Sequence, residues 1–208
     1  WQDGFTDGAD PEYEEQIIPL VRAAFAGATR VLDIGTGEGQ LARVVAQCGA
    51  QVDGVDPSAA QIRTAIERGG GVSYTQATAD ALPFEDATFD GVLACLVFEH
   101  ITDLAPAMRD VGRVLAPGGR MLLILNHPLL QAPGSGWIDD HILGEQYWRI
   151  GPYLPEDIRD ETLDKGVTLP FVHRPISAYL NAMFANGMVV EGFAEPPPVD
   201  AFLARAPE

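Results

Sequence analysis

The chain has 208 residues, 47% of them hydrophobic, which suits one α/β domain with a substantial insertion. A formal net charge of −17 and a pI of about 4.4 argue against nucleic acid, an anionic membrane surface or an acidic carrier protein as partners. There is no run of ~20 apolar residues and no visible signal peptide. The only cysteines, Cys48 and Cys95, are predicted to be buried reduced thiols. We therefore expect a cytoplasmic protein.

Strand-like and helical patterns alternate through the first 125 residues. An amphipathic helix is expected at 11–25, ahead of the first strand. The predicted strands are 31–34, 51–55, 72–76, 89–97 and 120–125, and the helices between them are 40–47, 58–67 and 104–115. Alternation of this kind is typical of a parallel, doubly wound sheet.

The alternation ends with the fifth strand. Residues 127–173 are rich in proline, glycine and aromatic side chains, and loops of this length are usually lids or binding loops. We therefore predict an inserted substrate lid there, and an N-terminal helix and cap at 1–28. A helix at 175–186 and strands at 188–193 and 201–206 are expected to close a single domain, 1–208, around a seven-stranded, mostly parallel sheet.

The turn after the first strand, in VLDIGTGEGQ, carries a carboxylate followed by alternating glycines. A glycine-rich turn between a strand and a helix usually suggests a phosphate cradle. Here, however, the spacing is Gly35, Gly37 and Gly39, and Asp33 and Glu38 would repel a pyrophosphate. S-adenosylmethionine has no phosphate and carries a sulfonium and an α-ammonium group, which favour nearby carboxylates. The glycines let the backbone approach such a ligand without a Cβ clash.

Two further carboxylates stand near the ends of predicted strands. Asp56 ends the second strand, where it can accept both hydroxyls of a ribose; the alternative is a solvated turn before Pro57. Asp80, in TADALPFEDATFD, is placed to accept a hydrogen bond from an adenine amino group, with Ala81 and Leu82 lining the ring. The alternative for Asp80 is a plain loop aspartate.

Five segments together resemble a known family: VLDIGTGEG, VDGVDPS, TADALPFEDATFD, VLACLVFEHITD and RVLAPGGRMLLI, which span roughly residues 30–125. The chain resembles class I S-adenosylmethionine-dependent methyltransferases of the type 11 small-molecule group. The resemblance implies a Rossmann-like fold, S-adenosylmethionine as cofactor and S-adenosylhomocysteine as product. It also implies cofactor contacts at Asp33, Gly35, Thr36 and Gly37 (methionine part), Asp56 and Pro57 (ribose), Asp80, Ala81 and Leu82 (adenine) and the Leu96 backbone (reacting methyl).

One position departs from the family pattern. Five residues after the ribose acid the family often has a methionine that packs on adenine, whereas this chain has Gln61. Gln61 also completes an S-x-x-Q capping box with Ser58, and the two roles are compatible. The resemblance is thinner at both ends of the chain. Residues 173–192 are similar to segments in some members but indicate no substrate.

Three histidines are candidates for a base that removes a proton from the methyl acceptor. His127 follows the fifth strand, His173 opens the segment that leads back into the domain, and His100 lies just past the fourth strand. The alternative for His127 is a local backbone cap before Pro128, and for His173 a hydrogen-bonded core or lid residue. No spacing of His, Cys, Asp and Glu indicates a metal site.

Aromatic residues of the predicted lid, Tyr147 and Trp148 among them, could line an apolar acceptor pocket or form the lid's own small core. Arg174 is a candidate clamp for an acidic substrate, with a salt bridge as the alternative. From the N-terminal side, the residues that could fold over the cofactor are Trp1, Phe5 and Tyr13.

The favoured function is transfer of a methyl group from S-adenosylmethionine to oxygen or nitrogen of a small molecule, by a monomer or homodimer that needs no nucleic acid or membrane. The main alternative is a methyltransferase-fold protein that has lost catalysis and binds S-adenosylmethionine or S-adenosylhomocysteine in a binding or regulatory role. A nucleotide-dependent oxidoreductase is disfavoured by Asp33 and by the glycine spacing. The charge argues against RNA as the substrate, though not against a protein.

Overall fold

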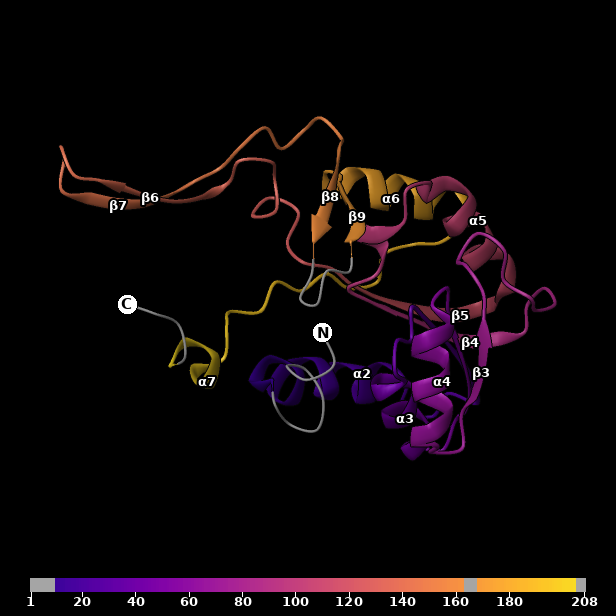
Figure 1. Ribbon diagram of the computed structural model, residues 1–208. Coiled ribbons are helices and arrows are strands. Elements are labelled where there is room, and N and C mark those ends of the chain that lie inside the picture. Colours follow the sequence, from indigo (N-terminus) through magenta and orange to yellow (C-terminus); the bar gives the residue numbers. More distant parts are fainter. Residues whose placement is uncertain (1–9, 163–167, 205–208) are drawn as a thin grey trace.

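A five-stranded parallel sheet forms the centre of the computed structural model, which describes residues 10–162 and 168–204 (Figure 1). The strand order is β3-β2-β1-β4-β5, so the order reverses between β1 and β4. The strands are β1 (Arg30–Ile34), β2 (Gln51–Asp56), β3 (Ser73–Gln76), β4 (Phe89–Cys95) and β5 (Leu115–Ile124). The predicted doubly wound α/β fold is therefore confirmed, with its ligand-binding edge expected at the carboxyl ends of β1 and β4.

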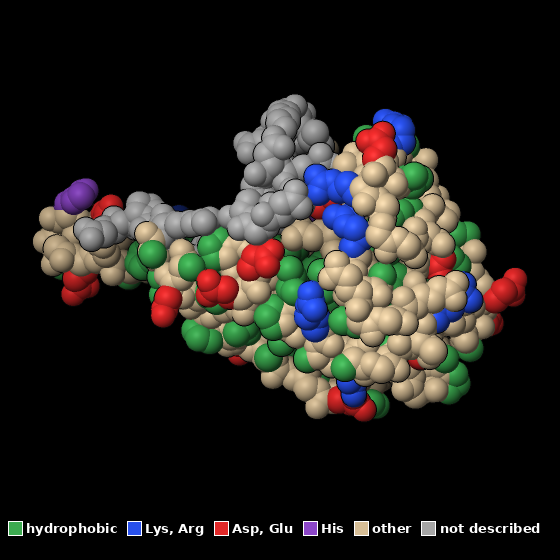
Figure 2. Space-filling model, turned by 90° about the horizontal axis from the view of Figure 1, so that it is seen from below, with side chains coloured by type: hydrophobic (Ala, Val, Ile, Leu, Met, Phe, Trp, Pro, Cys, Tyr) green, Lys and Arg blue, Asp and Glu red, His purple; other side chains and the backbone are tan. Residues whose placement is uncertain are grey.

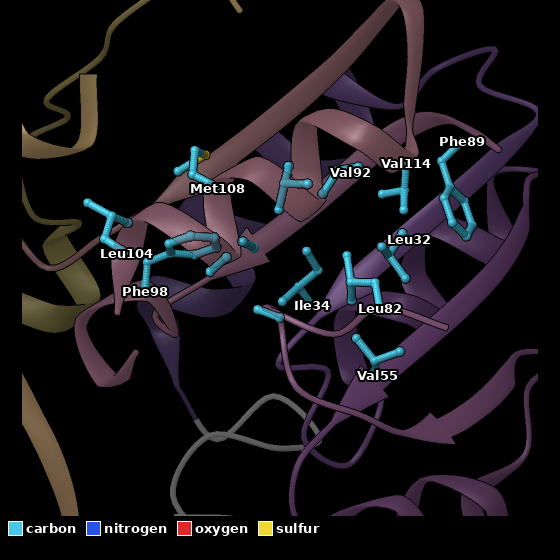
Figure 3. Packing of buried hydrophobic residues seen from close by; sticks show 14 of the residues in the cluster. Leu32, Ile34, Val55, Leu82, Phe89, Val92, Phe98, Leu104, Met108 and Val114 are labelled. Carbon is cyan, nitrogen blue, oxygen red and sulfur yellow. The ribbon is translucent and has the colours of Figure 1, made fainter. Parts of the chain in front are cut away.

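Helices cover both faces of this sheet (Figure 1). On one side, the N-terminal helix and α3 pack over a cluster that includes Val21, Val31 and Val45. On the other, α5 and α6 pack over a second cluster, and Figure 3 shows Leu32 and Val92 from the sheet among its residues. The helices are η1 (Tyr13–Ile17), α2 (Ile18–Ala24), α3 (Gln40–Gln47), α4 (Ala59–Arg68), η2 (Phe98–His100), α5 (Leu104–Val114), α6 (Ile176–Ala185) and α7 (Asp200–Leu203).

The predicted lid region contains two antiparallel hairpins. One pairs β6 (Gly136–Asp140) with β7 (Glu145–Arg149), and the other pairs β8 (Asp157–Thr162) with β9 (Thr168–His173). The β6–β7 hairpin projects from the body as an arm, and every residue of β7 is exposed (Figure 1). The second hairpin lies against the body, because β9 packs beside η2.

The prediction of seven strands in the central sheet was wrong for the part of the chain that is described, since five strands pair there. Residues 188–193 form no strand, and 200–203 form the short helix α7 in place of the expected strand. The triplet Pro196-Pro197-Pro198 lies between the two segments and lacks three backbone N–H donors, which a hairpin ladder needs. Because no described strand pairs with residues 188–193, these residues stay mostly exposed.

Two smaller predictions also need correction. β5 begins at Leu115 rather than 120, and a register shift between Phe89 and Gly91 of β4 accommodates the expected Pro-Gly-Gly turn inside the strand. Cys48 is exposed and Cys95 only partly buried, although both are free thiols. Cys48 is the C-cap residue of α3, in the short connection to β2. Across the described residues no helix is long and apolar enough to cross a membrane. Figure 2 shows acidic and basic side chains interspersed on one face.

Candidate active site

The turn between β1 and α3 brings a buried carboxylate and three left-handed glycines to the carboxyl edge of the sheet. Asp33 is only 3% exposed, and φ is +68° at Gly35, +55° at Gly37 and +83° at Gly39. A Cβ at Gly35 would lie 2.3 Å from Cγ2 of Val97, so this glycine allows β1 and the end of β4 to come together. A Cβ at Gly37 would meet no atom within 4 Å, so the turn is open on that side, where a ligand can approach.

Asp33 has no cationic partner among the described residues. Its Oδ2 accepts a hydrogen bond of 2.6 Å from the Thr36 hydroxyl. Burial raises the pKa of Asp33 to about 7, the Thr36 hydrogen bond opposes this rise, and the nearby Asp56 carboxylate adds to it. A buried carboxylate of this kind is stabilised in its charged form by a cation placed beside it.

Asp56, the last residue of β2, bridges the glycine turn and the start of α4. Its Oδ2 accepts from the Gly37 backbone N–H at 3.0 Å, and its Oδ1 accepts from the Ser58 backbone N–H at 2.8 Å. Burial raises the pKa of Asp56, and these two hydrogen bonds oppose the rise. A carboxylate offers about four acceptor positions, so Asp56 keeps roughly two for the hydroxyls of a ligand.

Glu38 plays a different part from the one expected. Its Oε2 lies 3.1 Å from Nη2 of Arg43 and 2.6 Å from Nη1 of Arg68. The two ion pairs offset its charge, so any repulsion of an anionic ligand comes from Asp33 and Asp56. The capping role predicted for Ser58 is confirmed, because its Oγ accepts from the Gln61 backbone N–H at 3.4 Å.

The loop that follows β3 holds the predicted adenine contacts. Asp80 and Ala81 are exposed, whereas Leu82 is buried. Two residues of α5 that the sequence analysis did not single out fasten this loop. The Leu82 N–H donates to Asp110 Oδ2 at 2.6 Å, and Nη2 of Arg113 donates to the Leu82 carbonyl at 3.0 Å. The spacing of Asp110 and Arg113, three residues apart on one helix face, was the available signal.

Leu96, directly after β4, has an unusual backbone conformation. Its φ is +53°, which costs a non-glycine residue about 1–2 kcal/mol. Its N–H donates to the Ile124 carbonyl at 2.9 Å, which fixes it between β4 and β5. Strained backbone of this kind concentrates at functional sites.

From the N-terminal helix, Tyr13 reaches the same edge, with its hydroxyl 4.0 Å from Cys95 Sγ. The other two residues expected to fold over the cofactor, Trp1 and Phe5, lie outside the described residues.

Comparisons with known proteins agree with this arrangement. A family model described as a methyltransferase domain matches residues 32–123. The O-methyltransferase resE of Aspergillus sclerotiorum is 36% identical over 223 aligned positions, which cover 94% of this chain and 80% of that enzyme. The chain belongs to the S-adenosylmethionine-dependent methyltransferases. A crystal structure of such a methyltransferase from Mesorhizobium loti has a TM-score of 0.78 at 33% identity, covering 90% of this chain and 88% of that one.

Other relatives of this methyltransferase match over a shorter stretch. The ubiquinone biosynthesis O-methyltransferase of Methylocella silvestris is 43% identical over 96 residues, or 44% of this chain. The chain spans only 38% to 51% of the length of several such ubiquinone-biosynthesis enzymes. The family and fold give S-adenosylmethionine as the cofactor. The buried Asp33, the open side of Gly37 and the spare acceptor positions of Asp56 fit its ammonium and ribose groups.

The three candidate histidines of the methyltransferase have different surroundings. His127 accepts from the Leu129 N–H at Nδ1 (3.2 Å), as its capping alternative predicted, and its Nε2 lies 2.6 Å from Glu195 Oε1. His100 Nδ1 lies 2.9 Å from the Pro170 carbonyl. His173 is 2% exposed, and its Nε2 lies 2.8 Å from a backbone carbonyl.

The candidate acceptor contacts in the lid do not gather at the sheet edge. Tyr147 and Trp148 lie on the projecting arm, where Trp148 packs edge-to-face with the 71% exposed Trp137 (Figure 1). Arg174 is buried, and its guanidinium donates to the carbonyls of Phe98, Ile101 and Thr102. Its Nε also lies 3.9 Å from Glu156 Oε1, the salt bridge given as the alternative, and these contacts argue against a clamp for an acidic substrate. In the described part of the chain no group of three His, Cys, Asp or Glu side chains is placed to hold a metal ion.

Proposed function

We propose that this chain transfers a methyl group from S-adenosylmethionine to a hydroxyl group of a small molecule. The observation that carries the proposal is the pair of buried carboxylates, Asp33 and Asp56, which meet the open glycine turn without a Lys or Arg partner among the described residues. When bound, S-adenosylmethionine supplies a methyl group activated by the positive charge on its sulfur.

Each residue of the edge has a proposed task. Asp33 and the turn through Gly37 hold the amino-acid part, because a buried carboxylate attracts an ammonium group. Asp56 accepts the ribose hydroxyls through its spare acceptor positions. Leu82, with Asp80 and Ala81, borders the adenine, and the remaining contacts assigned to the cofactor are Gly35, Thr36, Pro57, Gln61 and the Leu96 backbone.

The acceptor is proposed to bind beyond Leu96, where the carboxyl ends of β4 and β5 meet. The strained backbone of Leu96 holds this boundary in place between the two sites. Oxygen is the favoured target, because resE and the ubiquinone-biosynthesis relatives are named as O-methyltransferases. We further propose that the protein acts in the cytoplasm as a monomer or homodimer. Residues 1–28 are proposed as a cap and residues 127–173 as the substrate lid. The net charge of −17 disfavours nucleic acid as a partner.

Calorimetry with S-adenosylhomocysteine tests the proposal. The wild-type chain is expected to bind it, and Asp56→Asn to weaken binding roughly 10- to 100-fold, since a hydrogen bond to a charged group contributes about 1.5–3 kcal/mol. Asp53→Asn is the matched control: it changes a carboxylate of the same strand that pairs with Arg30 at 3.2 Å. Saturable NADH binding without S-adenosylhomocysteine binding would refute the proposal.

A further inference from the structure

A small hollow at the carboxyl ends of β4 and β5 is lined by none of the residues that we assign to the cofactor. It measures about 10 Å³, close to the space that one water molecule or one hydroxyl group needs. The residues that line it include Glu99 of η2, Asn126 after β5, and Phe171, His173 and Tyr179. β9 brings His173 to this position by packing beside η2. The hollow therefore lies near the ends of β4 and β5, where the acceptor is proposed to bind.

Glu99 and His173 both line the hollow, and each has a buried side-chain atom without a hydrogen-bond partner among the described residues. Glu99 is 4% exposed; its Oε1 accepts from the backbone and side-chain nitrogens of Asn126 at 3.3 and 3.0 Å, whereas its Oε2 is buried and has no partner among the described residues. His173 Nδ1 is likewise buried and unpaired there. Buried polar atoms without partners are rare and costly, so two in one hollow point to a ligand group that completes them.

The hydrogen-bonding state of each atom follows from its neighbours. The Tyr153 carbonyl can only accept, so His173 Nε2 carries the hydrogen, and Nδ1 of the neutral ring is an acceptor. Burial raises the pKa of Glu99. In the protonated form of Glu99 the proton lies on Oε2, because Oε1 already accepts two hydrogen bonds from Asn126, and Oε2 then donates. One donor and one acceptor on side chains that line this small space match a single hydroxyl group.

We infer that this hollow receives the hydroxyl group of the methyl acceptor, with Glu99 donating to its oxygen and His173 Nδ1 accepting its proton. The inference rests on the proposed function. As the hydroxyl oxygen bonds to the transferred methyl carbon, the carbon–sulfur bond breaks with its electron pair left on sulfur, and the hydroxyl proton moves to His173 Nδ1. The Tyr153 carbonyl, which accepts from Nε2, then stabilises the charged ring. Tyr153 is itself fixed, because its hydroxyl accepts from the Ile176 N–H at 2.8 Å.

The surroundings favour a neutral hydroxyl compound. Arg174, the one cation among the described lining residues, donates to backbone carbonyls, and its Nε lies 3.9 Å from Glu156 Oε1, so its charge is offset. The structure also separates His173 from the other candidate bases. Both ring nitrogens of His127 are engaged, and neither His127 nor His100 lines the hollow.

Nuclear magnetic resonance with ¹⁵N-labelled histidine tests this assignment, since the chain has four histidines. S-adenosylhomocysteine is first bound to saturation, which calorimetry monitors. 4-Methylphenol is then titrated as the probe. The His173 Nδ1 signal is expected to move with saturation. Glu99→Gln, which keeps a donor at the same place, should bind 4-methylphenol within about threefold of wild type, and Glu99→Leu at least tenfold more weakly. His141→Gln, which changes an exposed residue of the arm, is the control and should bind normally.

The outcomes are distinct. If S-adenosylhomocysteine does not bind, the proposed function fails, and the inference fails with it. If it binds but 4-methylphenol leaves the His173 signal unchanged, the proposed function stands and the hollow is not the acceptor site. If benzylamine moves the signal instead, and Glu99→Gln abolishes that effect, the hollow binds an ammonium group and the hydroxyl assignment is wrong. Since the central readout uses the wild-type chain, a variant that fails to fold does not prevent a decision.

Discussion

The raised pKa of Asp33 makes cofactor binding dependent on pH in a defined direction. In the free protein the pKa of Asp33 is about 7, mainly because the carboxyl group is buried. The α-ammonium group of S-adenosylhomocysteine, placed beside Asp33, favours the ionised form and lowers this pKa on binding, by about 1–3 units for an adjacent opposite charge. Binding therefore releases protons, and the affinity increases as pH rises through 7.

The magnitude follows from the fraction of Asp33 that is protonated. At pH 7 about half of the free protein carries this proton, so binding should release about 0.5 proton. At pH 6 roughly nine tenths carry it, and at pH 8 roughly one tenth, so the dissociation constant should fall about fivefold to tenfold from pH 6 to pH 8. The pKa of Asp56 is also raised, and that shift acts in the same direction.

Calorimetry at pH 6, 7 and 8, in two buffers with different ionisation enthalpies, measures both quantities. Asp33→Asn should remove most of the pH dependence. Thr36→Val should extend it to higher pH, because the Thr36 hydroxyl, 2.6 Å from Oδ2, lowers the pKa of Asp33. An affinity that stays constant from pH 6 to 8, with no proton released at pH 7, would show that Asp33 does not face the ligand's cation.

Three further predictions follow from the same contacts. Asp33→Asn should stabilise the free protein at pH 8 but not at pH 4. The pKa of Asp33 is about 7 in the folded protein against 3.8 for an ordinary aspartate, so the wild-type protein loses at most about 4 kcal/mol of stability as pH rises between these values. Thermal unfolding of the variant at both pH values checks this. Gly39→Ala should lower the melting temperature more than Gly49→Ala. A Cβ at position 39 would lie 2.1 Å from the Tyr74 hydroxyl, whereas a Cβ at position 49 would meet no atom within 4 Å. Equal losses of melting temperature would exclude the clash as the cause. Arg113→Ala should weaken S-adenosylhomocysteine binding about tenfold, because it releases the loop that contains Leu82. Arg109 is exposed on the same helix, and Arg109→Ala should leave the affinity unchanged. Titration calorimetry measures both affinities.

Local chemistry made the strand ends and the turns beside them predictable. Asp33 lies one residue before the end of β1 and Asp56 ends β2, and parallel strands bring such ends to one edge. The helix that begins after Ser58 was correctly placed because its cap is a contact between near neighbours. These features depend on residues a few positions apart, and the sequence states them directly.

The acceptor side depended on contacts that the sequence does not state. The apolar run at 188–193 has a strand-like composition, but a strand requires a partner, and none pairs with it in the described residues. Trp148 was expected near the acceptor because it is aromatic, whereas its position depends on the direction in which the β6–β7 arm projects (Figure 1). Glu99 was overlooked beside His100, since its importance arises only when β9 brings His173 to the same hollow.

A crystal structure of the chain with S-adenosylhomocysteine tests the central claim most directly. The account predicts the ribose hydroxyls within hydrogen-bond distance of the Asp56 carboxylate, the ammonium group beside Asp33, and the sulfur on the side of Leu96 that faces the hollow of Glu99 and His173. A ligand bound away from the carboxyl ends of β1, β2 and β4, or one whose ribose makes no contact with Asp56, would contradict it.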